Sequence, residues 1–104
     1  MRIYISGSIT NNRNFRYDFD RAAELLKEKF DGCDIVNPAW LHKVYENGTH
    51  AEYMKICLQL LKMSDTIYML PGWEVSKGAR KEYNFAIRHS ITVFFSDKER
   101  FIDE

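Results

Sequence analysis

Residues 66–86, TIYMLPGWEVSKGARKEYNFA, decide the fold of this chain. The run Thr66–Leu70 is apolar and rich in β-forming residues, and Pro71-Gly72 ends it with a turn signal. Ser76 is a residue type that caps helices, and one helix face then follows at spacings of three and four residues: Ala79, Glu82 and Ala86. The stretch therefore predicts a strand, a turn and a helix whose inward face carries the carboxylate of Glu82.

Glu82 has two interpretations from the sequence. A lone glutamate at the edge of a buried helix stripe is usually paired with a cation, here Arg80, Arg88 or a lysine. Alternatively, it serves a ligand at the start of its helix, where the partial positive charge of the N-terminus favours anions. Six residues at about 1.5 Å each put Glu82 roughly 9 Å along the axis from Ser76. A nucleoside monophosphate bound by its phosphate at Ser76 then lays its sugar near a carboxylate suited to attack on the anomeric carbon.

Strand-like and helix-like patterns alternate along the chain. Strands are predicted at Arg2–Ile5, Cys33–Val36, Asp65–Leu70 and Ile91–Phe95, and helices at Phe15–Phe30, at Ala51–Met63 and around Glu82. Pro38 takes the chain out of the second strand, residues 42–50 are polar and turn-rich, and residues 96–104 form a charged tail. Because parallel neighbours need crossovers, this order predicts a flavodoxin- or Rossmann-like three-layer α/β/α fold with a four- or five-stranded, mainly parallel sheet.

The composition predicts a single domain over residues 1–104. The 15 basic residues balance the 15 acidic ones, so the charge does not support binding of a nucleic-acid polymer. We see no export signal and no run of transmembrane length, which predicts a cytoplasmic protein without a membrane partner. Cys33 and Cys57 are expected as free thiols, and the three histidines share no metal-ligand spacing, so we expect neither a metal nor another cofactor.

Ligands of such sheets bind at the carboxyl ends of the strands. The loops predicted there are Ser6–Asn12, Asn37–Trp40, Leu70–Gly78 and Ser96-Asp97. Two loops suit an anion: Ser6-Gly7-Ser8 lets backbone N–H groups approach a ligand, and Ser76–Gly78 opens a helix. Neither matches the Walker or the dinucleotide-binding glycine pattern, and each alone is more simply a glycine-containing turn with an ordinary serine cap.

Five segments spread over nearly the whole chain carry a family pattern: Tyr4-Ile5-Ser6-Gly7-Ser8-Ile9, Asn37-Pro38-Ala39, Ser64-Asp65, Leu70-Pro71-Gly72-Trp73-Glu74 and Ser76-Lys77-Gly78-Ala79-Arg80-Lys81-Glu82. Together they resemble the nucleoside 2-deoxyribosyltransferase superfamily. Within it, the chain is most similar to the small uncharacterised proteins of the DUF4406 group, found in bacteria and phages. The Gly7-Ser8-Ile9 loop also resembles the deoxynucleoside 5′-monophosphate N-glycosidase branch.

The resemblance implies a flavodoxin-like fold and a role for each matched residue. Glu82 is implied as the nucleophile and Ser76 and Gly78 as 5′-phosphate contacts, while the loop Gly7, Ser8 and Ile9 surrounds sugar and base. Further substrate-binding candidates are Ser6, Asn37 and Trp73. Trp73 and Trp40 lie near the predicted mouth and either stack on a base or pack in the core. The resemblance also implies a homodimer in which the neighbour's C-terminal region completes each pocket, with Ser96 and Asp97 as candidates for that contribution or as a solvated tail.

The chain departs from the resembled family at one position. Relatives that cleave N-glycosidic bonds carry an acidic residue about eight positions before the aspartate that starts the third strand, and here that position is Cys57. The first hypothesis is therefore hydrolysis or transfer at the N-glycosidic bond of a (deoxy)nucleoside 5′-monophosphate or related nucleotide, with Glu82 as nucleophile. The alternative is a catalytically silent protein of the same fold that binds, and thereby sequesters, a nucleotide or nucleotide-derived signal.

Overall fold

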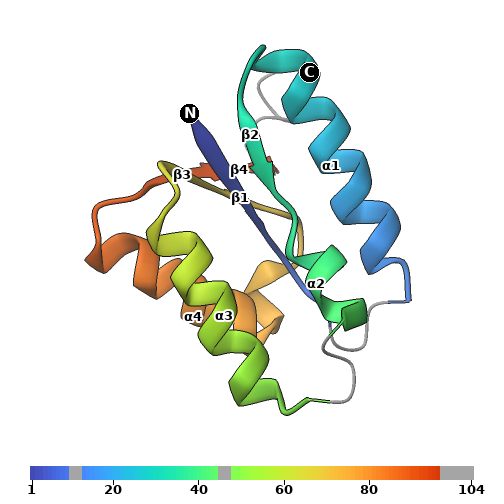
Figure 1. Cartoon of the computed structure of the whole chain (residues 1–104), viewed down its shortest axis with the longest axis vertical. Helices are drawn as coiled ribbons and strands as arrows, with labels where there is room; N and C mark the ends of the chain where they lie inside the picture. The colour runs from blue at the N-terminus through green and yellow to red at the C-terminus, as the bar shows by residue number, and fades with distance from the viewer. Residues whose placement is uncertain (10–12, 45–47, 97–104) are drawn as a thin grey trace.

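A four-stranded parallel sheet forms the centre of the computed structural model, which describes residues 1–9, 13–44 and 48–96 (Figure 1). Its strands are β1 (Arg2–Ser6), β2 (Asp34–Val36), β3 (Thr66–Met69) and β4 (Thr92–Phe95), in the spatial order β2-β1-β3-β4. All three neighbouring pairs are parallel. The predicted α/β class and parallel sheet are confirmed, and the described part of the sheet has four strands.

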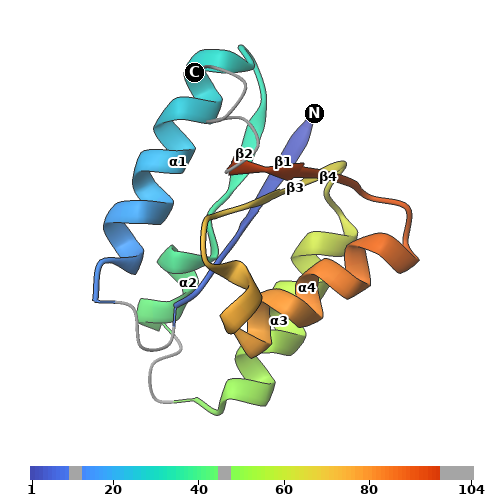
Figure 2. The same ribbon diagram turned by 180° about the vertical axis from the view of Figure 1, so that it is seen from behind.

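Helices cover both faces of this sheet (Figures 1 and 2). The helices are α1 (Phe15–Lys29), α2 (Pro38–Val44), α3 (His50–Lys62) and α4 (Lys77–Arg88), with a short 3₁₀ helix, η1 (Trp73–Val75), before α4. Helix α1 packs on one face, and α3 and α4 lie side by side on the other. The elements predicted from the sequence are confirmed, with individual ends shifted by a single residue.

Two hydrophobic clusters, one on each face, follow the alternation of the central strand β1. Ile3 and Ile5 join the cluster under α1, whereas Tyr4 joins the cluster under α3 and α4. Since side chains alternate between the faces of a strand, Ser6 points the same way as Tyr4. Both are fully buried, with 0% of their surface exposed, so their hydroxyl groups need partners inside the protein.

Helix α2 was not predicted. The sequence pattern made residues 42–50 a polar, turn-rich segment, but the chain is helical from Pro38 to Val44. Proline is well tolerated at the first position of a helix, where its missing N–H group costs nothing. Asn37 precedes it, and its side-chain oxygen accepts a hydrogen bond from the Ala39 N–H group at 3.1 Å. The proline that ends β2 therefore also begins a helix.

The connection from β3 to α4 sets where the helix begins. Gly72 has φ of +83°, a conformation that favours glycine, and the Trp73 N–H group donates to the Leu70 carbonyl across the turn. After η1, the Ser76 side chain caps α4 by accepting a hydrogen bond from the Ala79 N–H group at 3.2 Å. This connection leaves the start of α4 at the carboxyl end of the sheet, as Figure 1 shows.

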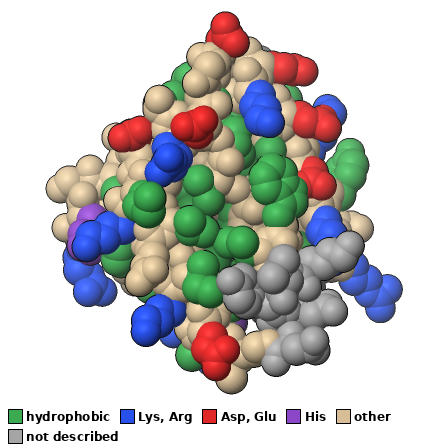
Figure 3. Space-filling view, viewed as in Figure 1, with side chains coloured by type: hydrophobic (Ala, Val, Ile, Leu, Met, Phe, Trp, Pro, Cys, Tyr) green, Lys and Arg blue, Asp and Glu red, His purple; other side chains and the backbone are tan. Residues whose placement is uncertain are grey.

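The surface is mixed in character. On the face in Figure 3, hydrophobic side chains gather toward the middle and most charged side chains stand around them. Cys33 and Cys57 are free thiols, as predicted. Within the described ranges, no helix has the length and apolar character needed to cross a membrane. Of the predicted charged tail, residues 96–104, the structure describes Ser96, and residues 97–104 lie outside the described residues.

Candidate functional site

The Glu82 carboxylate is buried and held by two hydroxyl groups from β1. Only 6% of the Glu82 surface is exposed. The Tyr4 hydroxyl donates to Oε2 of Glu82, and the Ser6 hydroxyl donates to Oε1 at 2.7 Å. One residue separates the two donors on the strand, so the pleat points both at the same carboxylate. The partners of this glutamate are therefore two neutral hydroxyl groups, in contrast to the cationic side chain that usually pairs with a helix glutamate.

Burial and hydrogen bonding act in opposite directions on Glu82. Burial raises its pKa to about 7, because the charged form loses its contact with water, while the hydrogen bonds from Tyr4 and Ser6 lower it. A carboxyl group with a pKa near neutrality can exist as an anion at working pH and still react readily as a nucleophile or a base. Glu82 is therefore suited to chemistry.

The buried tyrosine and cysteine side chains around Glu82 keep their protons at neutral pH. Burial, followed by the nearby Glu82 charge, raises the pKa of Tyr4 well above its ordinary range. Burial likewise raises the pKa of Tyr53, whose hydroxyl donates to the Pro38 carbonyl at 2.6 Å. Burial also raises the pKa of the Cys57 thiol to about 11. Within this cluster, Glu82 is the group that changes charge near neutral pH.

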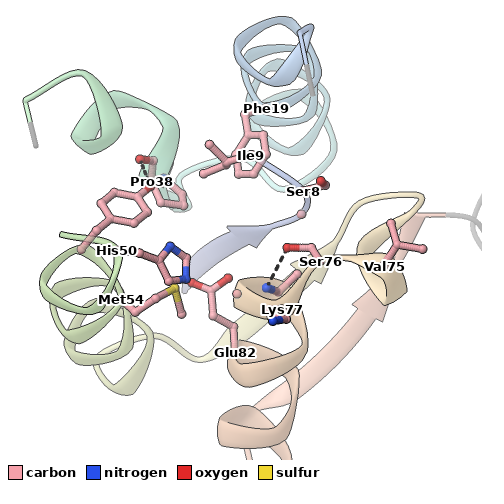
Figure 4. Close-up of a pocket in the computed structure, with 14 residues that line it drawn as sticks. Ser8, Ile9, Phe19, Pro38, His50, Met54, Val75, Ser76, Lys77 and Glu82 are labelled. Atoms are coloured by element: carbon pink, nitrogen blue, oxygen red, sulfur yellow. Dashed lines mark hydrogen bonds between the residues drawn. The ribbon is translucent and has the colours of Figure 1, made fainter. Parts of the chain in front are cut away.

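A cavity of about 470 Å³ opens in front of the carboxylate (Figure 4). Its volume lies in the range of small-molecule binding sites, about 300–1,000 Å³. The lining residues come from the loop after β1, from α1 and α2, from α3, and from the segment that opens α4. The cavity thus lies at the carboxyl end of β1, where the sheet order reverses direction and where ligands of parallel sheets bind.

The first turn of α4 forms one wall of the cavity. Ser76, Lys77 and Gly78 line it, and the N–H groups of a first helical turn have no acceptor within the helix. A Cβ atom built on Gly78 would lie 3.2 Å from the Met54 sulfur and 3.7 Å from Cε1 of His50. Glycine therefore lets α3 approach α4 closely at this point. Together with the Lys77 ammonium group, this wall suits an anionic ligand.

The loop after β1 forms the facing wall. Gly7, Ser8 and Ile9 all line the cavity, as predicted. A Cβ atom on Gly7 would lie 3.0 Å from Cβ of Leu70, so only glycine lets this loop lie against the end of β3 without displacement. The structure thus brings six predicted site residues to one cavity: Gly7, Ser8, Ile9, Ser76, Gly78 and Glu82.

Other predicted site residues lie elsewhere. Ser6 contacts Glu82 from behind and does not line the cavity. Asn37 does not line the cavity: its side-chain oxygen caps α2, and its side-chain nitrogen donates to Asp20 at 2.9 Å. Trp73 does not line the cavity either. Its ring packs on Tyr83 of α4 and on Phe95 of β4, with ring centroids 4.7 and 6.0 Å away, beside the hydrophobic cluster under α3 and α4.

The remaining positions from the sequence analysis are the neighbour-subunit candidates Ser96 and Asp97, and Cys57, which stands where the resembled enzymes carry an acidic residue. Ser96 directly follows β4, and Asp97 lies outside the described residues. Cys57 has only 1% of its surface exposed and does not line the cavity.

Three functional candidates were missed by the sequence interpretation. The ring of Tyr4 is buried in the core, and its hydroxyl group holds Glu82. The sequence signal for this role was the spacing of two residues between Tyr4 and Ser6, which places both side chains on the same face of the strand. Lys77 lines the cavity as the first residue of α4, and His50 lines it as the first residue of α3. His50 carried no local signal, because only the packing of α3 against α4 brings it to the cavity.

Among the residues that the structure describes, no group of three or more histidine, cysteine or acidic side chains is placed to hold a metal ion. A family model described as "Domain of unknown function (DUF4406)" matches residues 1–95 of the chain. Comparisons with curated proteins and with solved structures found no match.

Proposed function

The chain belongs to the DUF4406 family of domains of unknown function, and we propose that it cleaves the N-glycosidic bond of a nucleoside 5′-monophosphate with Glu82 as nucleophile. The observation that carries the proposal is the buried Glu82 carboxylate, held by Tyr4 and Ser6 and facing a ligand-sized cavity. A carboxylate kept from water in this way has no evident role in folding, since its burial costs stability.

The phosphate belongs at the start of α4. Ser76, Lys77 and Gly78 offer a helix N-terminus and an ammonium group to the cavity. Gly78 and Glu82 are four residues apart on the same face of α4, so a ligand anchored at the first turn extends toward the carboxylate. Ser76 and Glu82 are about 9 Å apart along the helix axis, so a ligand whose phosphate contacts the first turn can place its sugar near the carboxylate.

The reaction has two displacement steps. The Glu82 anion attacks the anomeric carbon, the carbon–nitrogen bond breaks, and the base leaves with the bonding electrons and gains a proton. The resulting glycosyl ester of Glu82 is then opened by water, which gives hydrolysis, or by a second base, which gives transfer. The hydrogen bonds from Tyr4 and Ser6 fix both carboxylate oxygens and keep the anion populated despite its burial.

A second candidate function is binding without turnover. Cys57 stands where the resembled enzymes carry their acid, and its thiol is buried and holds its proton. A pocket that lacks this acid binds a nucleotide and releases it intact, which suits a sequestering protein. The two candidates share the phosphate wall and differ in the fate of the glycosidic bond.

A homodimer belongs to the same proposal and rests on the family resemblance. The strand β4 ends at Phe95, and Ser96 follows it, so a neighbouring chain could contribute from this end. Sedimentation analysis of the purified chain tests this part: a single species with the mass of one chain contradicts it.

Incubation with a panel of ribo- and deoxyribonucleoside 5′-monophosphates tests the function. Chromatography of the mixture separates free base from intact nucleotide. Free base that accumulates with the wild-type protein, and not with Glu82→Gln, supports cleavage. Bound nucleotide recovered intact after long incubation supports the sequestering function, and the absence of both binding and base release contradicts both candidates.

A further inference from the structure

His50 and Met54 form a stripe on α3 that faces the stripe of Gly78 and Glu82 on α4. Both pairs are spaced by four residues, so each pair shares one helix face. The position of a Cβ atom on Gly78 lies 3.2 Å from the Met54 sulfur and 3.7 Å from Cε1 of His50. The imidazole of His50 therefore lies over the first turn of α4, and in Figure 4 it points toward the Glu82 carboxyl group across the same cavity.

The proposed reaction needs a proton for the leaving base. The hydroxyl groups of Tyr4 and Ser6 are engaged with Glu82, and that of Tyr53 donates to the Pro38 carbonyl. The thiol of Cys57 is buried and outside the cavity lining. The hydroxyl groups of Tyr4, Ser6 and Tyr53 and the Cys57 thiol therefore do not supply the proton.

The described lining of the cavity also holds two side chains with basic nitrogen atoms, His50 and Lys77. Lys77 belongs to the wall that we assign to the phosphate, where its ammonium group is used as the partner of that anion. Imidazole is the side chain that most often donates and accepts protons near neutral pH. His50 is also exposed at the start of α3, so it can exchange protons with solvent between turnovers.

We propose that His50 is the general acid of this site and takes the place of the carboxyl group missing at position 57. As the carbon–nitrogen bond breaks, the imidazolium gives its proton to the departing nitrogen, whose bonding electrons come from that bond. In the second step the neutral imidazole takes a proton from the attacking water, and the Glu82 carboxylate is released. This assignment rests on the proposed N-glycosidase function and adds a catalytic residue to it.

A change of leaving group separates proton donation from positioning. His50→Gln removes the acid and keeps a polar side chain of similar reach at an exposed helix start. Base release from the preferred nucleoside 5′-monophosphate is expected to fall about 10²-fold or more, the usual contribution of a general acid. The second substrate is a 4-nitrophenyl glycoside of the same sugar 5-phosphate, whose leaving group, 4-nitrophenolate, is a stable anion that needs no proton. Cleavage of this substrate is expected to change by less than about threefold in His50→Gln, since general-acid catalysis does not contribute to it.

His89→Gln is the matched control. His89 caps the far end of α4 and stacks on Phe85, with ring centroids 4.0 Å apart, so its loss leaves both substrates unaffected. Unchanged nucleotide cleavage by His50→Gln overturns the assignment and leaves the role of Glu82 intact. Equal losses on both substrates also overturn it, because they show positioning. If the wild-type protein releases base from no nucleotide but cleaves the nitrophenyl substrate through Glu82, the site has no proton donor and the assignment to His50 is wrong. If the wild-type protein cleaves neither substrate, the proposed function itself is wrong.

Discussion

The Tyr4 hydroxyl donates a hydrogen bond to the Glu82 carboxylate, although 78 residues separate the two in the sequence. The contact joins the central strand β1 to helix α4 across the buried face of the sheet. It also stabilises a negative charge that burial opposes. The properties of Glu82 therefore depend on this contact as much as on its own helix.

Loss of the Tyr4 hydroxyl is expected to raise the pKa of Glu82 further. Tyr4→Phe keeps the ring in the core and removes one of the two donors to the carboxylate. The acid limb of the pH profile for base release should move upward by about one unit, since the charged form loses a hydrogen bond. Tyr68→Phe is the matched control, because Tyr68 packs in the cluster on the opposite face of the sheet. An acid limb that stays in place in Tyr4→Phe contradicts the role given to this hydroxyl.

Glu82 is expected to make the fold less stable as pH rises. Its pKa is about 7 in the folded chain and has an ordinary value of 4.5. Below pH 4.5 both states hold the proton and the full stability is present. Between these values the folded state keeps a proton that the unfolded chain has released, so stability falls as pH rises, by about 3 kcal/mol in total.

Urea unfolding of wild type and Glu82→Gln at pH 4.5 and pH 8 measures this term. The neutral amide does not titrate, so only the wild type loses stability through this group as pH rises. Between pH 4.5 and pH 8 the unfolding free energy of Glu82→Gln should therefore increase by about 3 kcal/mol relative to that of the wild type. A difference that is the same at both pH values would mean that the carboxyl group has no raised pKa in the folded protein.

Gly78→Ala is expected to weaken binding through the phosphate. The added methyl group would lie 3.2 Å from the Met54 sulfur, at the wall where the first turn of α4 meets the cavity. Affinity for a nucleoside 5′-monophosphate should fall about tenfold or more, equivalent to about 1.4 kcal/mol. Affinity for the nucleoside without phosphate should change little. Titration calorimetry with both ligands checks this, and equal losses for the two would place the phosphate elsewhere.

Asn37→Ala is expected to affect stability and not the ligand. The variant loses the cap of α2 and the hydrogen bond to Asp20. The free energy of unfolding should fall by about 1–2 kcal/mol, as for other caps. Nucleotide affinity, measured where the variant is fully folded, should stay within about twofold, since a cap contributes to the helix and not to the ligand. A large loss of affinity at normal stability would return Asn37 to the substrate-binding residues.

The sequence predicts those parts of the fold that depend on local chemistry. The periodicity around Phe15–Phe30 and the turn at Pro71-Gly72 each act over a few residues, and both appear in the structure. The cap at Ser76 and the inward orientation of Glu82 were also predicted from local patterns, and both appear in the structure. Helix α2 escaped prediction because Pro38 reads as a strand breaker, and its role as a first helical residue depends on the Asn37 cap.

The sequence predicted the site residues that lie on loops, because the topology of the sheet brings these loops together. It did not predict the site residues whose position depends on how two helices pack. Parallel strands bring Gly7 and Gly78 to one edge of the sheet, so both were predicted and both line the cavity. For Trp73 the sequence left base stacking and packing open, because the orientation of a 3₁₀ turn depends on contacts such as those with Tyr83 and Phe95. His50 was missed because its place depends on the approach of α3 to α4, which no short motif records.

Base release by wild-type protein and by Glu82→Gln is the most direct test of the central claim. The measurement incubates each protein with the panel of nucleoside 5′-monophosphates and quantifies free base by chromatography. We expect the wild type to release base from at least one nucleotide and Glu82→Gln to be slower by about 10³-fold or more, as for loss of a nucleophile. Base release at the same rate from both proteins would contradict the account.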